Sequence, residues 1–286
     1  MLPETSNKQA ASPIHTFSTT LRDAARSVAT FTLVLLFIVV IWQFVKALFQ
    51  LDSFTLPDVG DILGVMLKPL QADKAALGIL LLNAGLFTLR EATLGFMLGA
   101  AVGFMLAIVF AHSRLMQRGL MPFVVASQTI PILAIAPMVV VWLRADWLSV
   151  AVIAAYLTFF PVAINTLRGL LSVSPTALEL MESYAASRWQ ILIKLRIPTA
   201  LPYIFTALKI SATASVVGAI IGELPSGIQD GLGYAILNFN QYYIQGPARL
   251  WATNLMAALI GLVAFGVISL TERLVVRWKS PLSEAR

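Results

Sequence analysis

The sequence lacks cysteine and has little charge. None of its 286 residues is cysteine, only 12% are charged, and its two histidines, His15 and His112, are far apart. Without cysteine the chain can form neither a disulfide framework nor a thiolate metal site. A typical soluble domain has about 25% charged residues. The sequence therefore predicts no metal centre, and its composition argues against a soluble domain.

Apolar residues dominate the chain instead. Hydrophobic residues make up 58% of it, and the mean hydropathy is +0.84. No single water-soluble core would absorb so much apolar side chain, so the surplus is expected to face lipid. A bilayer core about 30 Å thick needs roughly 20 apolar residues per helix. Six segments reach this length: 29–49, 91–111, 120–143, 148–167, 199–221 and 251–270. The predicted fold class is all-α, a polytopic transmembrane helical bundle of about six spans.

The distribution of basic residues predicts the orientation. Thirteen of the 20 Lys and Arg residues fall on the side of the two termini, four fall on the other side, and three lie in or beside spans. Because short cytoplasmic loops carry an excess of Lys and Arg, both termini are expected in the cytoplasm. This topology also explains the net charge of +6 without a nucleic-acid partner. The polar residues 1–28 are interpreted as an uncleaved cytoplasmic tail.

The loop between the fourth and fifth predicted spans, Arg168–Arg196, is longer than most helix connections. Ser174 or Thr176 can cap a helix there, Pro175 suits its first turn, and Glu179 completes a capping box with Thr176. The sequence therefore predicts a short helix inside this loop.

One face of that helix is apolar. Leu178, Met181 and Ala185 recur at helical spacing, which makes the helix amphipathic. Such a helix can dock in a groove of another protein or lie on lipid headgroups, and periodicity alone does not separate these two interpretations.

The same stretch resembles the cytoplasmic "EAA" signature of ABC importer permeases, which is Glu-Ala-Ala, three residues, Gly, nine residues and Ile-x-Leu-Pro. Here it reads Glu179-Leu-Met, three residues, Ala185, nine residues and Leu195-Arg-Ile-Pro198. Leu180 and Met181 replace the two alanines, and Ala185 replaces the glycine. The tight bend expected at the glycine is therefore predicted to be relaxed or replaced by a longer helix.

Further stretches resemble the nitrate, sulfonate and taurine branch of that family. They are Gln128-Thr-Ile-Pro131 with Ala134 and Pro137, Phe160-Pro161 with Asn165, Ala186-Ser-Arg-Trp-Gln190, and Pro198-Thr-Ala-Leu-Pro202. The resemblance implies a type I ABC importer permease core over residues 80–275 with a coupling loop at 168–198. The cytoplasmic tail 1–28, a first transmembrane helix at 29–50 and a cytoplasmic C-terminal tail at 276–286 flank this core.

The resemblance also implies partners. These are a cytoplasmic ATP-binding cassette ATPase, an extracytoplasmic solute-binding protein and a second copy of the permease, assembled in the bacterial inner membrane. The chain contains no GxxxxGK[ST] phosphate loop, so ATP hydrolysis is assigned to a separate subunit. No catalytic residue and no cofactor is predicted.

Site residues follow from the resemblance and from polar residues in the spans. The predicted ATPase-coupling residues are Leu178, Glu179, Met181, Glu182, Ala185, Ser187, Arg188, Leu195, Ile197 and Pro198. The candidates for the translocation path are Ser127, Gln128, Thr129, Asn165, Lys209, Ser211 and Ser215. The candidates for docking of the binding protein are Glu223, Asp230 and Tyr234. Polar residues in spans also form interhelical hydrogen bonds, and Lys209 can instead extend to the membrane interface.

Glycines repeat every four residues in the second predicted span, at Gly95, Gly99 and Gly103. This pattern allows helices to approach closely. Packing within the subunit is the favoured interpretation, and a contact between two copies is the second.

Three other classes of protein compete with an ABC permease. An intramembrane enzyme needs a nucleophile with a base, or metal ligands, at helical spacing, and the sequence has neither. A secondary transporter or channel not driven by ATP is the alternative function. Paired carboxylates inside the membrane or an inverted repeat would favour it, but only Glu91 and Glu223 approach the membrane, both near its edge, and the sequence shows no internal repeat. A scaffold without transport does not explain the loop. The solute stays open between an anion and a heterocycle.

Overall fold

A computed structural model of the chain describes residues 13–70, 75–144 and 146–276. Within these residues every regular element is a helix. The chain divides into two compact units, Met1–Asp61 and Ile62–Arg286. Each unit is described separately below.

The first unit consists of helix α1 (Pro13–Leu48) and the loop that follows it. The helix begins at Pro13, inside the predicted tail 1–28, and residues 1–12 lie outside the described residues. Its apolar stretch, Thr32–Leu48, exposes most of its side chains, as expected of a helix in contact with lipid.

Two contacts fold the loop back onto the end of α1. The indole nitrogen of Trp42 donates to the carbonyl oxygen of Pro57 at 3.1 Å, and the Lys46 ammonium pairs with the Asp58 carboxylate at 2.6 Å. The hydrogen bond from Lys46 holds the pKa of Asp58 below its usual value. The charge of Lys46, at the end of the first predicted span, is thus neutralised within the same unit.

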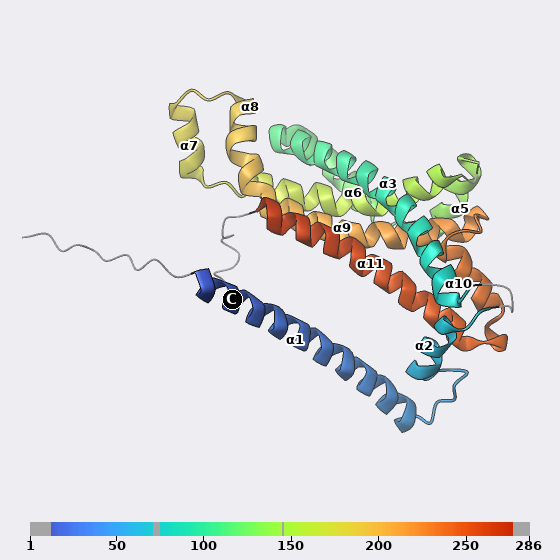
Figure 1. Cartoon of the computed structure of the whole chain (residues 1–286). Coiled ribbons are helices and arrows are strands. Elements are labelled where there is room, and N and C mark those ends of the chain that lie inside the picture. The colour runs from blue at the N-terminus through green and yellow to red at the C-terminus, as the bar shows by residue number, and fades with distance from the viewer. Residues whose placement is uncertain (1–12, 71–74, 145, 277–286) are drawn as a thin grey trace, which may run out of the picture. The chain divides into compact units, whose positions relative to one another are not determined.

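The second unit is built around four long helices that lie alongside one another (Figure 1). They are α3 (Leu77–His112), α6 (Trp147–Leu171), α9 (Ile197–Ser226) and α11 (Pro247–Val275). The shorter elements are α2 (Val59–Leu67, which begins in the first unit), α4 (Arg114–Ser127), α5 (Ile132–Trp142), α7 (Pro175–Ser183), α8 (Arg188–Ile191), η1 (Leu192–Arg196), α10 (Leu232–Gln241) and η2 (Tyr243–Gln245). Helix α6 is central, because it packs along both α3 and α9.

Four of the six predicted spans correspond to long apolar helices, and the first corresponds to the shorter apolar stretch Thr32–Leu48. Within the described residues, four helices are long and apolar enough to cross a membrane, and α4 with α5 forms a fifth only if that bent pair counts as one span. The predicted third span, 120–143, consists of two helices that meet at 95°. Pro131 explains the break, because it lacks an amide hydrogen and disfavours helical geometry in the residue before it.

The glycine repeat of α3 is the seam between α3 and α6. A Cβ atom added to Gly99 would lie 2.5 Å from the carbonyl oxygen of Ala155, and one added to Gly103 would lie 2.5 Å from that of Phe159. Gly95 faces Ala151 and Ala154 in the same way. The favoured prediction, packing within the subunit, is confirmed.

Replacing Gly99 by alanine is expected to destabilise the bundle. The new methyl group would meet backbone atoms of α6, and overpacking of this kind costs about 1–3 kcal/mol. Thermal unfolding in detergent measures the loss. Gly261→Ala is the matched control, because a Cβ atom there meets open space within the part of the chain that the structure describes. Equal melting temperatures for the two variants would contradict the close seam.

Candidate functional site

Helix α7 has a well-defined N-terminus. The Ser174 hydroxyl accepts a hydrogen bond from the backbone amide of Ala177 at 3.3 Å, and Pro175 occupies the first turn. Of the two predicted caps, Ser174 is therefore the one used, and Thr176 lies inside the helix. Every side chain of α7 is exposed or half-buried, so the helix lies on the surface of the unit.

Ala185 makes the sharp turn at the other end of α7. Its φ of 51° lies in the left-handed region. The amide of Ala185 donates to the carbonyl of Glu182 at 2.8 Å, and the amide of Ala186 donates to the carbonyl of Met181 at 3.0 Å. These two bonds form a Schellman motif, which usually has glycine at the left-handed position. The predicted relaxed bend or longer helix is therefore wrong: the bend is kept, with alanine in place of glycine.

Ala185→Gly is expected to stabilise the loop. Glycine adopts the left-handed conformation without the steric cost that a Cβ atom carries, a difference of about 1 kcal/mol per residue. Hydrogen exchange of the α7 amides should slow in this variant. Ala186→Gly is the matched control, because Ala186 does not have a positive φ, and it should speed exchange or leave it unchanged. Faster exchange in Ala185→Gly would contradict the strained turn.

The chain returns to the bundle through α8, η1 and α9. Ser187 and Gln190 form a reciprocal capping box that begins α8. The π-helical turn η1 follows and leads directly into α9 at Ile197, just before Pro198. A proline cannot donate the usual helical hydrogen bond, and a wider turn before it accommodates this loss.

Two contacts connect this return segment to neighbouring helices. Leu192 is buried in a cluster with Phe110 of α3 and Leu170 of α6. The Arg196 guanidinium donates to the carbonyl of Ala111 at the end of α3, at 2.9 Å. A displacement of the α7–α8 loop would therefore act directly on α3 and α6.

The predicted coupling residues divide between two faces of the loop. Leu178, Glu182 and Arg188 line a cavity of about 260 Å³ that faces the chain's own His112 and Arg196. Met181 and the return residues Leu195, Ile197 and Pro198 are half-buried, whereas Glu179, Ala185 and Ser187 are exposed.

Between Pro175 and Ile191, three exposed apolar side chains are ones that sequence reasoning missed. Leu180 is 56% exposed, Tyr184 is 77% exposed and Trp189 is 64% exposed. Leu180 and Tyr184 are four residues apart and so share one side of the segment. Their apolar character at this spacing is the sequence signal that identifies them. We call Leu180 and Tyr184 the outer face of the loop, whereas the ring of Trp189 lies against that of His112 of α3, with 5.6 Å between the ring centroids.

The predicted path residues fall into an exposed group and a packed group. Ser127, Gln128 and Thr129 lie at the bend between α4 and α5, where Gln128 and Thr129 are exposed. The hydroxyl of Tyr156 on α6 donates to the backbone carbonyl of Ser127 and so connects the bend to α6. Gln128 and Thr129 thus present exposed polar side chains at the non-helical stretch between α4 and α5.

The remaining path candidates have partners inside the bundle. The Asn165 amide donates to the carbonyl of Pro161 at 2.9 Å. Ser211 donates to the carbonyl of Thr158 at 3.2 Å and Ser215 donates within α9, and both serines are buried. The Lys209 ammonium pairs with Glu272 of α11 at 2.8 Å. Among the described residues, no hydrogen bond or ion pair joins these four residues to the bend at 127–129.

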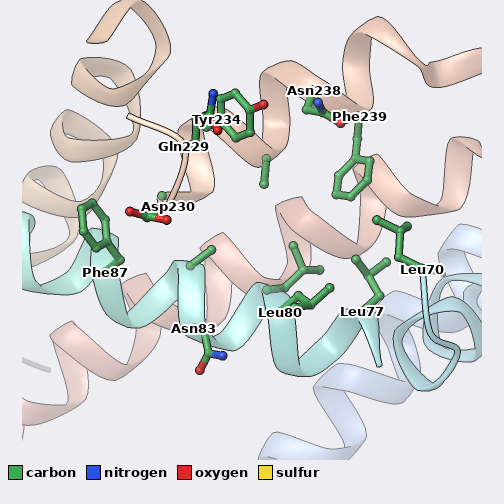
Figure 2. A pocket seen from close by; sticks show the side chains of 14 residues that line it. Leu70, Leu77, Leu80, Asn83, Phe87, Gln229, Asp230, Tyr234, Asn238 and Phe239 are labelled. Carbon is green, nitrogen blue, oxygen red and sulfur yellow. The ribbon is translucent and has the colours of Figure 1, made fainter. Parts of the chain in front are cut away.

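At the end of the bundle away from α7, helices α3 and α10 border a recess of about 540 Å³. Asp230 and Tyr234, both predicted docking residues, line it together with Phe87 and Phe239 (Figure 2). None of the described residues that line it is basic. Glu223 is not on this surface, because it is only 1% exposed.

These features define a class: a multi-pass helical membrane protein in which a loop of two short helices, held to the bundle by buried contacts, projects at one end (Figure 1). The chain belongs to the family of binding-protein-dependent transport system inner membrane components, whose match covers residues 99–277. It is thus a permease subunit of an ABC importer, as the EAA-like motif indicated. Membership implies two kinds of partner, an ATPase and a solute-binding protein.

Curated relatives agree with this family. The chain is 32% identical to the riboflavin transport system permease protein RibX of Chloroflexus aurantiacus, over 86% of this chain and 88% of that protein. It is 32% identical to the formylaminopyrimidine transport permease protein ThiX of Halalkalibacterium halodurans, over 67% and 76%. It is 28% identical to the putative aliphatic sulfonates transport permease protein SsuC of Bacillus subtilis, over 85% of each chain.

Proposed function

We propose that the loop Pro175–Ile191 is the contact through which a cytoplasmic ATPase drives this permease. The observation that carries the proposal is the outer face of the loop. Exposed apolar side chains beside a helix that projects from the bundle suit docking in a groove of a partner protein. Glu179 is exposed on the same helix and would add a polar contact.

The buried contacts of the loop supply a route for the movement. Closure of the ATPase would displace α7, and the displacement would reach α3 through Arg196 and Leu192. Because packed helices move as rigid elements, a shift at this end would change the angle of α3 and α9 together. ATP hydrolysis is thereby coupled to the opening and closing of a path.

A second copy of the chain is the proposed neighbour of α4 and α5. These helices expose apolar side chains, with Phe123 at 73%, Met138 at 71% and Trp142 at 82%. The polar residues Gln128 and Thr129 lie at the bend between them. Packing of two copies here would cover the apolar side chains and enclose the two bends, where the exposed polar groups would contact the solute.

The recess beside α10 is the proposed docking area of the solute-binding protein. It lies at the end of the bundle away from the coupling loop, and Asp230 and Tyr234 supply polar and aromatic contacts there. In the proposed arrangement the coupling loop and both termini are cytoplasmic and the recess lies outside the bacterial inner membrane, which agrees with the prediction from the distribution of basic residues.

Site-directed cross-linking tests the arrangement, and the absence of native cysteine removes any background from this chain. A cysteine at Tyr184 is expected to cross-link to the ATPase, and one at Phe123 is expected to cross-link two permease copies. A cysteine at Tyr242, an exposed tyrosine that follows α10, is the matched control and should not reach the ATPase. Cross-linking from Tyr242 but not from Tyr184 would overturn the proposal.

A further inference from the structure

Two acidic side chains are buried together in the second unit. Glu91 of α3 is 2% exposed, Glu223 of α9 is 1% exposed, and their carboxyl groups are neighbours. Among the described residues, both carboxyl oxygens of Glu91 and Oε1 of Glu223 lack a hydrogen-bond partner. Buried polar atoms of native proteins almost always have partners, so three orphan oxygens at one place need an explanation.

The fourth oxygen has a structural task at the start of α10. Oε2 of Glu223 accepts a hydrogen bond from the amide of Gly233 at 2.5 Å, and the hydroxyl of Thr88 accepts one from the amide of Leu232 at 2.9 Å. Side chains of α9 and α3 therefore satisfy the first amides of α10, which lacks a cap of its own. The position of α10 depends on the Glu223 carboxyl group.

The backbone is fitted closely around this carboxyl group. A Cβ atom at Gly231 would overlap the carboxyl atoms of Glu223, and one at Gly233 would lie 2.6 Å from its Cβ atom. The packing thus leaves no room for a larger residue at either position. A small displacement of Glu223 would be transmitted to α10.

One cation lies near the pair without an ion pair to it. Arg90 of α3 is exposed and lines a cavity of about 250 Å³ together with Glu91 and Asp146, but it forms no ion pair among the described residues. Asp146, at the N-terminus of α6, adds negative charge near Glu91, and the exposed Asp230 lies just before α10. Two ionised carboxylates in contact, each at most 2% exposed, would repel each other.

We infer that Glu91 and Glu223 form a binding site for one proton, shared between their carboxyl groups, which fastens the start of α10 to the bundle. The proton supplies a hydrogen bond between Glu91 and Oε1 of Glu223, so at least two of the three orphan oxygens gain a partner. Oε2 keeps its bond to Gly233. Without the proton the two negative charges push apart and the start of α10 is released.

This site has a consequence for the recess beside α10. Gly231, Tyr234 and Phe239 line that recess, so the proton holds one of its walls in place. The start of α10 is held to the bundle while the proton is bound, and it is released as the pH rises and the proton leaves. The proposed proton site does not depend on the proposed function. The two are connected only if the solute-binding protein docks in the recess.

Infrared difference spectroscopy on the full chain in nanodiscs detects the proton directly. We expect a band of a protonated carboxyl group at neutral pH that is absent in Glu91→Gln. Glu272→Gln is the matched control, since this carboxylate is paired with Lys209, and it should keep the band. No such band in the wild type, or an unchanged band in Glu91→Gln, would overturn the inference.

Hydrogen exchange of α10 measures the fastening. After correction for the intrinsic rate, wild-type protection of residues 232–241 should fall at least about tenfold as the proton is lost. In Glu91→Gln the amide donates to Glu223 in place of the proton, so protection should persist as the pH rises. Equal pH dependence in both proteins would contradict a shared proton, and it would leave the coupling-loop proposal untouched.

Discussion

Tyr184→Ala is expected to abolish most ATP-driven uptake by removing the main contact with the ATPase. Exposed aromatic residues that become buried in an interface often contribute 2 kcal/mol or more to binding, which is about a 30-fold change in affinity. Tyr184 is 77% exposed and contributes no buried packing to its own bundle, so its loss should leave the fold intact. Co-purification with the ATPase and uptake into proteoliposomes measure the effect.

Tyr242→Ala is the matched control for this experiment. Tyr242 is 53% exposed and follows α10, at the end of the bundle away from α7. The Tyr242→Ala variant should still co-purify with the ATPase. Glu179→Lys is a second test of the same face, because it reverses an exposed charge on α7. Normal ATPase binding in both Tyr184→Ala and Glu179→Lys would refute the coupling-loop proposal.

Composition and motif spacing predicted the class of this protein because both depend on local sequence. Apolar runs of about 20 residues define membrane helices whatever their neighbours are. The spacing from Glu179 to Ala185 and Pro198 likewise depends only on the order of residues, and it indicated the family that the comparison then showed.

What the sequence did not predict depends on which residues meet in space. Pro131 accounts for the break between α4 and α5, but the angle of 95° between the two helices depends on how each packs against its neighbours. Ala185 shows that a backbone position can demand a left-handed residue even when the side chain disfavours it. The neighbouring bonds to Glu182 and Met181 outweigh that preference.

The pair Glu91 and Glu223 is the clearest example of a contact that the sequence did not predict. Glu91 and Glu223 are 132 positions apart in the chain, and the sequence placed both near the membrane edge without pairing them. The packing of α3 against α9 brings them together, so the argument that the chain lacks paired carboxylates is wrong. The pair nevertheless does not make the chain a secondary transporter, since its family is that of ABC importers.

Lys209→Met is expected to destabilise the bundle, and a second substitution is expected to restore it. The ammonium of Lys209 and the carboxylate of Glu272 join α9 to α11 at 2.8 Å, with side-chain exposures of 21% and 24%. Removing one partner leaves the other charge uncompensated. The loss is about 3–5 kcal/mol for a fully buried pair, and it should be about 1–3 kcal/mol at this exposure.

The double variant Lys209→Met with Glu272→Met separates a structural role from a role in transport. Replacing a whole ion pair by apolar residues of similar volume is often neutral, so thermal stability should return to near the wild-type value. If Lys209 serves only to pair with Glu272, uptake should return as well. A double variant that is stable but does not transport would instead assign Lys209 to the solute path, because the lost function would then follow the ammonium group and not the packing.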